Sequence, residues 1–154
     1  MTPLQAKYVH TNLVARDWRW LADFYQQVFG CVPVPPERHL AGGWLEAATG
    51  VPNAEIRGQH LRLPGWGQAG PTLEIFEYPV EGQRPETAVN RPGFAHLAFA
   101  VDDVAEAREA VLAAGGRAVG ETMTADIPGA GQITFIYMAD PEGNILELQK
   151  WNKV

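Results

Sequence analysis

Large apolar residues recur at every second position in four stretches of the chain, and this pattern is typical of β-strands. The four stretches are residues 8–14, 72–78, 94–101 and 144–150. In the third stretch, Leu97 and Phe99 share one face, while His96 lies on the opposite face. We therefore expect strands with one apolar face, which packs against a helix, and one face that carries polar chemistry.

Two segments have apolar residues at helical spacing, and both begin after an aspartate. Asp17 is a candidate N-cap for a helix over residues 18–29, which Gly30 would end. Asp103 begins the second segment, with Glu106 three residues later as in a capping box. This pattern predicts a second helix, ending at the glycine pair at 115–116.

Between these segments, turn residues and short apolar runs predict further elements. We expect a short strand in residues 31–40 that breaks at the two prolines, a short helix over 44–49, a strand over 54–63, strands over 117–121 and 132–138, and a hairpin turn at 140–144.

The second half of the chain resembles the first. YVHTNLVARD at residues 8–17 aligns with FAHLAFAVDD at 94–103, so that His10 matches His96. PTLEIFEY at 71–78 resembles NILELQKW at 144–151, and there Glu74 matches Glu147. Such self-similarity indicates two copies of one structural unit.

Each copy reads as strand, helix and then three strands, which predicts an α+β fold of two tandem βαβββ modules. The first module spans residues 6–79 and the second spans residues 93–152. Residues 80–92 are polar and rich in proline, and we interpret them as the linker.

The composition is that of a globular protein, with 154 residues of which 46% are hydrophobic and 19% charged. A formal charge of −6 argues against nucleic acid as a partner, since phosphates attract a surplus of Lys and Arg. No apolar run approaches the length of a membrane span, and no apolar signal core begins the chain. The single cysteine, Cys31, forms no internal disulfide. We expect a cytoplasmic protein that acts on a small molecule.

His10, Glu74, His96 and Glu147 all lie opposite the apolar faces of their strands. A single strand His is seldom a metal ligand, and strand Glu residues are usually solvated. The repetition of the same residue types in both copies favours a shared role. If the copies pair around a pseudo-twofold axis, the four side chains can converge on one divalent metal. Two adjacent carboxylates without a metal would repel each other.

This order of His, Glu, His and Glu on duplicated modules resembles the vicinal oxygen chelate superfamily. That group includes glyoxalases, methylmalonyl-CoA epimerases, extradiol dioxygenases, fosfomycin-resistance proteins and bleomycin-binding proteins. The motifs that carry the resemblance are VHTNLVARDWRWLADFYQQVFG, GPTLEIFEY, GFAHLAFAVDD and YMADPEGNILELQ. The resemblance implies one glyoxalase-like domain over residues 1–154, with a curved mixed sheet around a metal site and helices on the outside.

The resemblance further implies that the four His and Glu residues bind one divalent transition metal, namely Zn, Ni, Co, Mn or Fe, with two positions left for water or substrate. Glyoxalases and epimerases use a ligand at the Glu74 position, whereas extradiol dioxygenases and fosfomycin enzymes generally do not. We therefore expect a lyase or isomerase that stabilises an enediolate or enolate. By the same resemblance, Glu147 is the expected catalytic carboxylate and Glu74 the second.

Two alternatives stay open, an Fe(II) extradiol-type dioxygenase and a metal-free drug-binding protein of the bleomycin-resistance type. A binding protein would be expected to lose ligand residues, and this chain keeps all four. Asn12, His60, Arg62 and Tyr137 are candidate substrate-binding residues, although His60 and Arg62 also fit a solvated strand edge. The resemblance also implies a homodimer.

Overall fold

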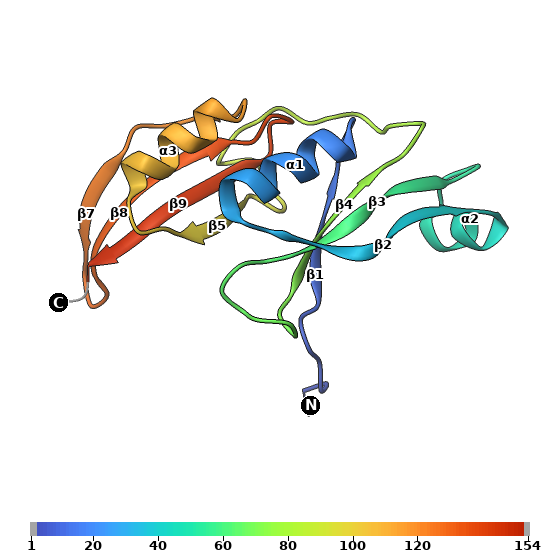
Figure 1. Cartoon of the computed structure of the whole chain (residues 1–154), viewed down its shortest axis with the longest axis horizontal. Coiled ribbons are helices and arrows are strands. Elements are labelled where there is room, and N and C mark those ends of the chain that lie inside the picture. Colours follow the sequence, from blue (N-terminus) through green and yellow to red (C-terminus); the bar gives the residue numbers. More distant parts are fainter. Residues whose placement is uncertain (1–2, 153–154) are drawn as a thin grey trace. The chain divides into compact units, whose positions relative to one another are not determined.

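The computed structural model describes residues 3–152, so the outermost residues of the expected 1–154 domain lie outside the described part. The chain divides between Gly82 and Gln83 into two compact units (Figure 1). Each unit contains one of the two sequence copies.

The N-terminal unit contains a four-stranded mixed sheet and two helices. Its elements are β1 (His10–Val14), α1 (Trp18–Phe29), β2 (Val32–Ala41), α2 (Gly43–Thr49), β3 (Glu55–Arg62) and β4 (Thr72–Glu77). The strand order is β1-β4-β3-β2, in which β1 and β4 are parallel and the other pairs are antiparallel. Figure 1 shows β1 in blue beside β4 in light green.

The C-terminal unit repeats this topology with one helix. Its elements are β5 (His96–Ala100), α3 (Val104–Ala113), β6 (Arg117–Ala118), β7 (Met123–Ile127), β8 (Gly131–Ala139) and β9 (Ile145–Asn152). The strand order is β5-β9-β8-β6, with β5 and β9 parallel, and β7 pairs with β8. The α+β fold class predicted from the sequence is therefore confirmed.

Both long helices begin at the predicted aspartates. The Asp17 side chain accepts a hydrogen bond from the Trp20 backbone N at 3.0 Å, and Asp103 accepts one from the Glu106 backbone N at 2.9 Å. Gly30 ends α1 in the left-handed conformation, with φ of 65°. These caps satisfy backbone groups that a helix end leaves without partners.

The apolar face of each sheet meets a helix, as predicted. Helix α1 packs on β3 and β4, where Leu61, Leu73 and Ile75 are fully buried. Helix α3 packs on β8 and β9, where Leu146 and Leu148 are fully buried. Burial of these faces against the helices leaves the opposite faces, with their His and Glu residues, for other roles.

Three elements differ from the sequence-based expectation. Strand β2 continues past the prolines at 35 and 36, with a register shift between Val34 and Arg38 instead of a break. Proline has no N–H to donate, so the pairing skips it and resumes. The strand expected over 117–121 is limited to β6, and β7 was not expected.

Within residues 3–152, no helix is long and apolar enough to cross a membrane.

Candidate functional site

In each unit, the sheet register brings the predicted Glu next to the predicted His. The register pairs are Asn12 with Glu74 on β1 and β4, and Ala98 with Glu147 on β5 and β9. Asn12 and Ala98 follow His10 and His96 by two residues, and side chains two apart on a strand share a face. The Glu carboxylate and the His imidazole therefore lie on the same face of neighbouring parallel strands.

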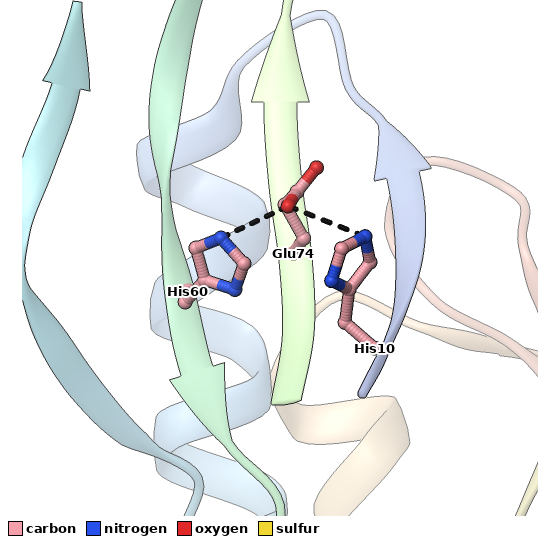
Figure 2. Close-up of side chains that lie close together, drawn as sticks. All are labelled: His10, His60 and Glu74. Atoms are coloured by element: carbon pink, nitrogen blue, oxygen red, sulfur yellow. Dashed lines mark ion pairs between the residues drawn. The ribbon is translucent and has the colours of Figure 1, made fainter. Parts of the chain in front are cut away.

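The N-terminal unit adds a second imidazole to its pair. Figure 2 shows His10 on β1, Glu74 on β4 and His60 on β3, with both rings directed at the same carboxylate. The Nε2 of His60 lies 2.9 Å from Glu74 Oε2, and the Nε2 of His10 lies 3.5 Å from the same oxygen. One ligand atom from each residue lies within 4.8 Å of the others.

Neighbouring side chains hold this cluster in place. Asn12 Nδ2 donates a hydrogen bond to Glu74 Oε1 at 3.0 Å, which leaves Oε2 facing the two imidazoles. His60 Nδ1 and Thr72 Oγ1 lie 2.8 Å apart, within hydrogen-bond distance. Contacts of this kind orient a metal-binding His or carboxylate when they occur around a metal site.

The surroundings favour the neutral form of His60. Burial lowers the pKa of His60, while the negative charge of Glu74 acts in the opposite direction. The positive charge of Arg38 and the proximity of His10 lower the pKa further. A neutral imidazole is the form that can bind a metal or accept a proton.

The C-terminal unit contains the second pair without a second imidazole. His96 Nε2 lies 3.0 Å from Glu147 Oε2. Tyr137 stands in register with Glu147, as His60 does with Glu74, and its ring centroid lies 5.2 Å from that of His96. Burial raises the pKa of Tyr137, and the charge of Glu147 adds to this effect, so its phenol stays protonated near neutral pH.

The four expected ligands thus form two pairs, one in each unit. The four expected substrate-binding residues occupy different settings. Asn12 holds Glu74, His60 belongs to the N-terminal cluster, Tyr137 lies beside His96, and Arg62 lies two residues beyond His60 on β3.

Sequence reasoning did not identify His60 as a possible metal donor. Its signal was the alternation in residues 54–63, which places His60 and Arg62 on one face. That signal does not reveal the strand pairing of His60 with Glu74, because the two residues are 14 positions apart and meet only through the β3–β4 register.

The donor chemistry of both pairs fits a divalent transition metal. Imidazole nitrogens and carboxylate oxygens bind Zn, Fe, Co, Ni and Mn at about 2.0–2.2 Å. Two such atoms separated by about 90–110° around an ion lie about 3.0–3.4 Å apart. The His–Glu distances of 3.5 Å and 3.0 Å are close to this range.

Comparison with protein families gives a match to the glyoxalase-like domain over residues 10–148. Among curated protein sequences, none matches the chain.

Several solved structures share the fold. A glyoxalase family protein from Bacillus cereus has 18% sequence identity and a TM-score of 0.76, and the match covers 99% of this chain and 97% of that one. A glyoxalase/bleomycin resistance protein/dioxygenase family enzyme from Burkholderia phytofirmans has 17% identity and a TM-score of 0.58, covering 96% and 100%. The fosfomycin resistance protein FosX from Listeria monocytogenes, solved with Mn(II) and sulfate, has 15% identity and a TM-score of 0.55, covering 97% and 95%.

Proposed function

The chain belongs to the glyoxalase-like domain family of the vicinal oxygen chelate superfamily, and we propose that it is a metal-dependent lyase or isomerase of the glyoxalase or epimerase type. One observation supports the proposal above the others. The His–Glu pair occurs twice, at equivalent register positions of two sheets with the same topology. Two unrelated solvated pairs would not be expected to repeat in this way.

In this proposal His10, Glu74, His96 and Glu147 hold one divalent transition metal, which is Zn, Ni, Co, Mn or Fe. The bound metal would supply Lewis acidity and so stabilise negative charge on substrate oxygens. Its support is the donor chemistry of the two pairs, together with the Mn(II) described for FosX of Listeria. Nitrogen donors favour these ions over Ca and Mg, which prefer shells made entirely of oxygen.

Glu147 is the proposed general base, which takes a proton from a carbon next to a substrate carbonyl. The surroundings of the two carboxylates differ in a way that supports this choice. Glu74 accepts a hydrogen bond on Oε1 from Asn12 and faces two imidazoles with Oε2. Beside Glu147, the position of Asn12 is taken by Ala98, whose methyl group donates no hydrogen bond. Glu147 therefore lacks the side-chain donor that fixes one oxygen of Glu74.

The proposed substrate is a small oxygenated molecule with an acidic C–H bond. Arg62 and His60 lie on the polar face of β3, and a guanidinium there would bind an anionic substrate group. Tyr137 would donate a hydrogen bond to a substrate oxygen, because its raised pKa keeps the phenol protonated.

We also propose a homodimer. Strands β1 and β2 form the edges of the N-terminal sheet, and unpaired edges are open to pairing or coverage by another chain. Light scattering at micromolar concentrations is the test, and a mass close to 16.9 kDa would contradict it.

An Fe(II) dioxygenase of the extradiol type is the second candidate. The observation in its favour is the cluster of His10, His60 and Glu74, since two His and one carboxylate form the usual ligand set of non-haem Fe(II) oxygenases.

Metal analysis and isotope exchange separate these functions. The purified protein is reconstituted with each of the five ions, and its metal content is measured. It is then incubated in deuterated water with the glutathione adduct of methylglyoxal and with methylmalonyl-CoA, and separately with catechols and Fe(II) in air. Deuterium incorporation supports the lyase or isomerase, and ring opening supports the dioxygenase. Failure to bind any of the ions would refute both.

A further inference from the structure

The two units differ at one position of their otherwise equivalent polar faces. In the N-terminal unit His60 is in register with Glu74. At the equivalent position of the C-terminal unit, Tyr137 is in register with Glu147. The N-terminal unit therefore brings together three side chains with metal-donor atoms, on three adjacent strands, whereas the His96–Glu147 pair of the C-terminal unit brings together two.

We propose that His60 is a fifth metal ligand, so that His10, His60 and Glu74 hold the ion of the proposed function from three adjacent strands of the N-terminal unit. The inference deepens the proposed function, on which it rests for the presence of a metal. It adds His60 to the four ligands that the duplication predicts.

The distances carry the first step. Glu74 Oε2 lies 2.9 Å from His60 Nε2 and 3.5 Å from His10 Nε2, and one ligand atom of each residue lies within 4.8 Å of the others. Ligands bound to one ion at about 2.1 Å and about 90–110° apart are separated by about 3.0–3.4 Å. The three donors thus need only small adjustments to bind a common ion (Figure 2).

Each of two donors also has an orienting partner. With Nε2 on the metal, neutral His60 carries its proton on Nδ1 and donates it to Thr72 Oγ1, which lies 2.8 Å away. Asn12 donates to Glu74 Oε1 and so directs Oε2 toward the imidazoles. This arrangement matches the outer contacts that fix metal-binding His and carboxylate side chains.

Another His–Glu pair of the same unit, His39 with Glu55, lies in a different setting. His39 Nε2 lies 2.8 Å from Glu55 Oε1, and the Arg57 guanidinium lies 2.8 Å from the same oxygen. The cation already neutralises this carboxylate, and the His39 side chain is 65% exposed against 19% for His60. His39 is therefore a matched control for His60.

The proposal has a consequence for the division of roles between the units. With three donors in the N-terminal unit, loss of His96 and Glu147 would weaken metal binding without abolishing it. Glu147 is then available for proton transfer without loss of the ion.

The test measures Co(II) binding to full-length variants by calorimetric titration. His60→Gln is expected to weaken binding by more than about 100-fold, since loss of an orienting contact alone costs about 10–100-fold. His39→Gln should bind like the parent, and the double variant His96→Gln/Glu147→Gln should bind more tightly than His60→Gln. Equal affinities of His60→Gln and the parent would overturn the inference and leave the proposed function intact. A parent that binds no metal would overturn both.

Pulsed EPR of the copper(II)-loaded double variant distinguishes a ligand from an orienting residue. Two imidazoles coupled to Cu(II) are expected, from His10 and His60, and a single imidazole would refute ligation by His60. This measurement keeps His60 in place, so it decides the question even if His60→Gln fails to fold. Circular dichroism with a chelator present reports on the folding of each variant.

Discussion

Asn12 donates a hydrogen bond to Glu74, with Nδ2 3.0 Å from Oε1. The equivalent position beside Glu147 is Ala98, which has no polar side chain to offer. Two carboxylates that match in the duplicated sequence thus have different surroundings in the fold. We have proposed separate roles for them, with Glu74 as a fixed ligand and Glu147 as the carboxylate that moves a proton.

Replacing the two carboxylates one at a time tests this division. Glu147→Gln should keep the fold, because the replacement is nearly isosteric and Leu146 and Leu148 remain buried. Exchange of the substrate C–H in deuterated water, with metal saturating, should fall by roughly 10²–10⁴-fold, because an amide cannot act as a general base. Glu74→Gln should show a smaller loss under the same conditions.

The opposite outcome is informative. If Glu147→Gln exchanges as fast as the parent and Glu74→Gln is inactive, the two roles are reversed. If both variants exchange normally, neither carboxylate abstracts the proton, and the dioxygenase function gains support.

Asn12→Ala is expected to weaken metal binding by about 10–100-fold, since the orienting hydrogen bond to Glu74 is lost. The catalytic rate at saturating metal should change less, because Asn12 contacts the proposed metal ligand Glu74 and not the proposed base Glu147. Thr11→Ala is the control, as Thr11 lies on the opposite face of β1. Equal metal affinities of Asn12→Ala and Thr11→Ala would show that the hydrogen bond does not orient Glu74 for binding.

Gly58 on β3 is in register with Phe76 on β4. A Cβ at this position would overlap the carbonyl oxygen of Ile75 and come 2.5 Å from a ring carbon of Phe76. Gly58→Ala should therefore lower the free energy of unfolding by about 1–3 kcal/mol, as measured by urea denaturation. Gly43→Ala should be neutral or stabilising, because nothing lies within 4 Å of its Cβ and α2 begins there. A Gly58→Ala variant as stable as the parent would contradict the close packing.

Cys31 should be unreactive in the folded protein. It is 3% exposed, and burial raises the pKa of its thiol from 9.0 to about 11. At pH 8 about one thiol in a thousand is then ionised, and the thiolate is the reactive form. A disulfide reagent should label the native protein slowly and the urea-unfolded protein quickly. Rapid labelling of the native chain would disprove the burial.

The raised pKa of Cys31 also makes the stability of the fold depend on pH. The folded state holds the Cys31 proton up to about pH 11, whereas the unfolded state releases it near 9.0. The stability that Cys31 contributes is therefore present below pH 9 and is lost as the pH rises toward 11. Cys31→Ser should show a smaller fall in stability between pH 9 and 11 than the parent, and equal slopes would contradict the raised pKa.

Local features of the fold could be predicted from the sequence. Asp17 and Asp103 begin the two long helices, since an N-cap acts on backbone groups only two or three residues away. The period-two pattern assigned His10 and Glu74 to polar strand faces, because successive side chains alternate whatever the partner strand is. The duplication was visible because both copies keep these local patterns.

Long-range pairing could not be read in this way. Strand β7 exists because it pairs with β8, and β2 continues past its prolines because β3 supplies partners on both sides of them. His10 and His60 both reach Glu74 because β4 lies between β1 and β3 in the sheet. Strand order and register depend on contacts between distant residues, so the sequence by itself determined which side chains face outward, and only the tertiary structure decided which of them meet.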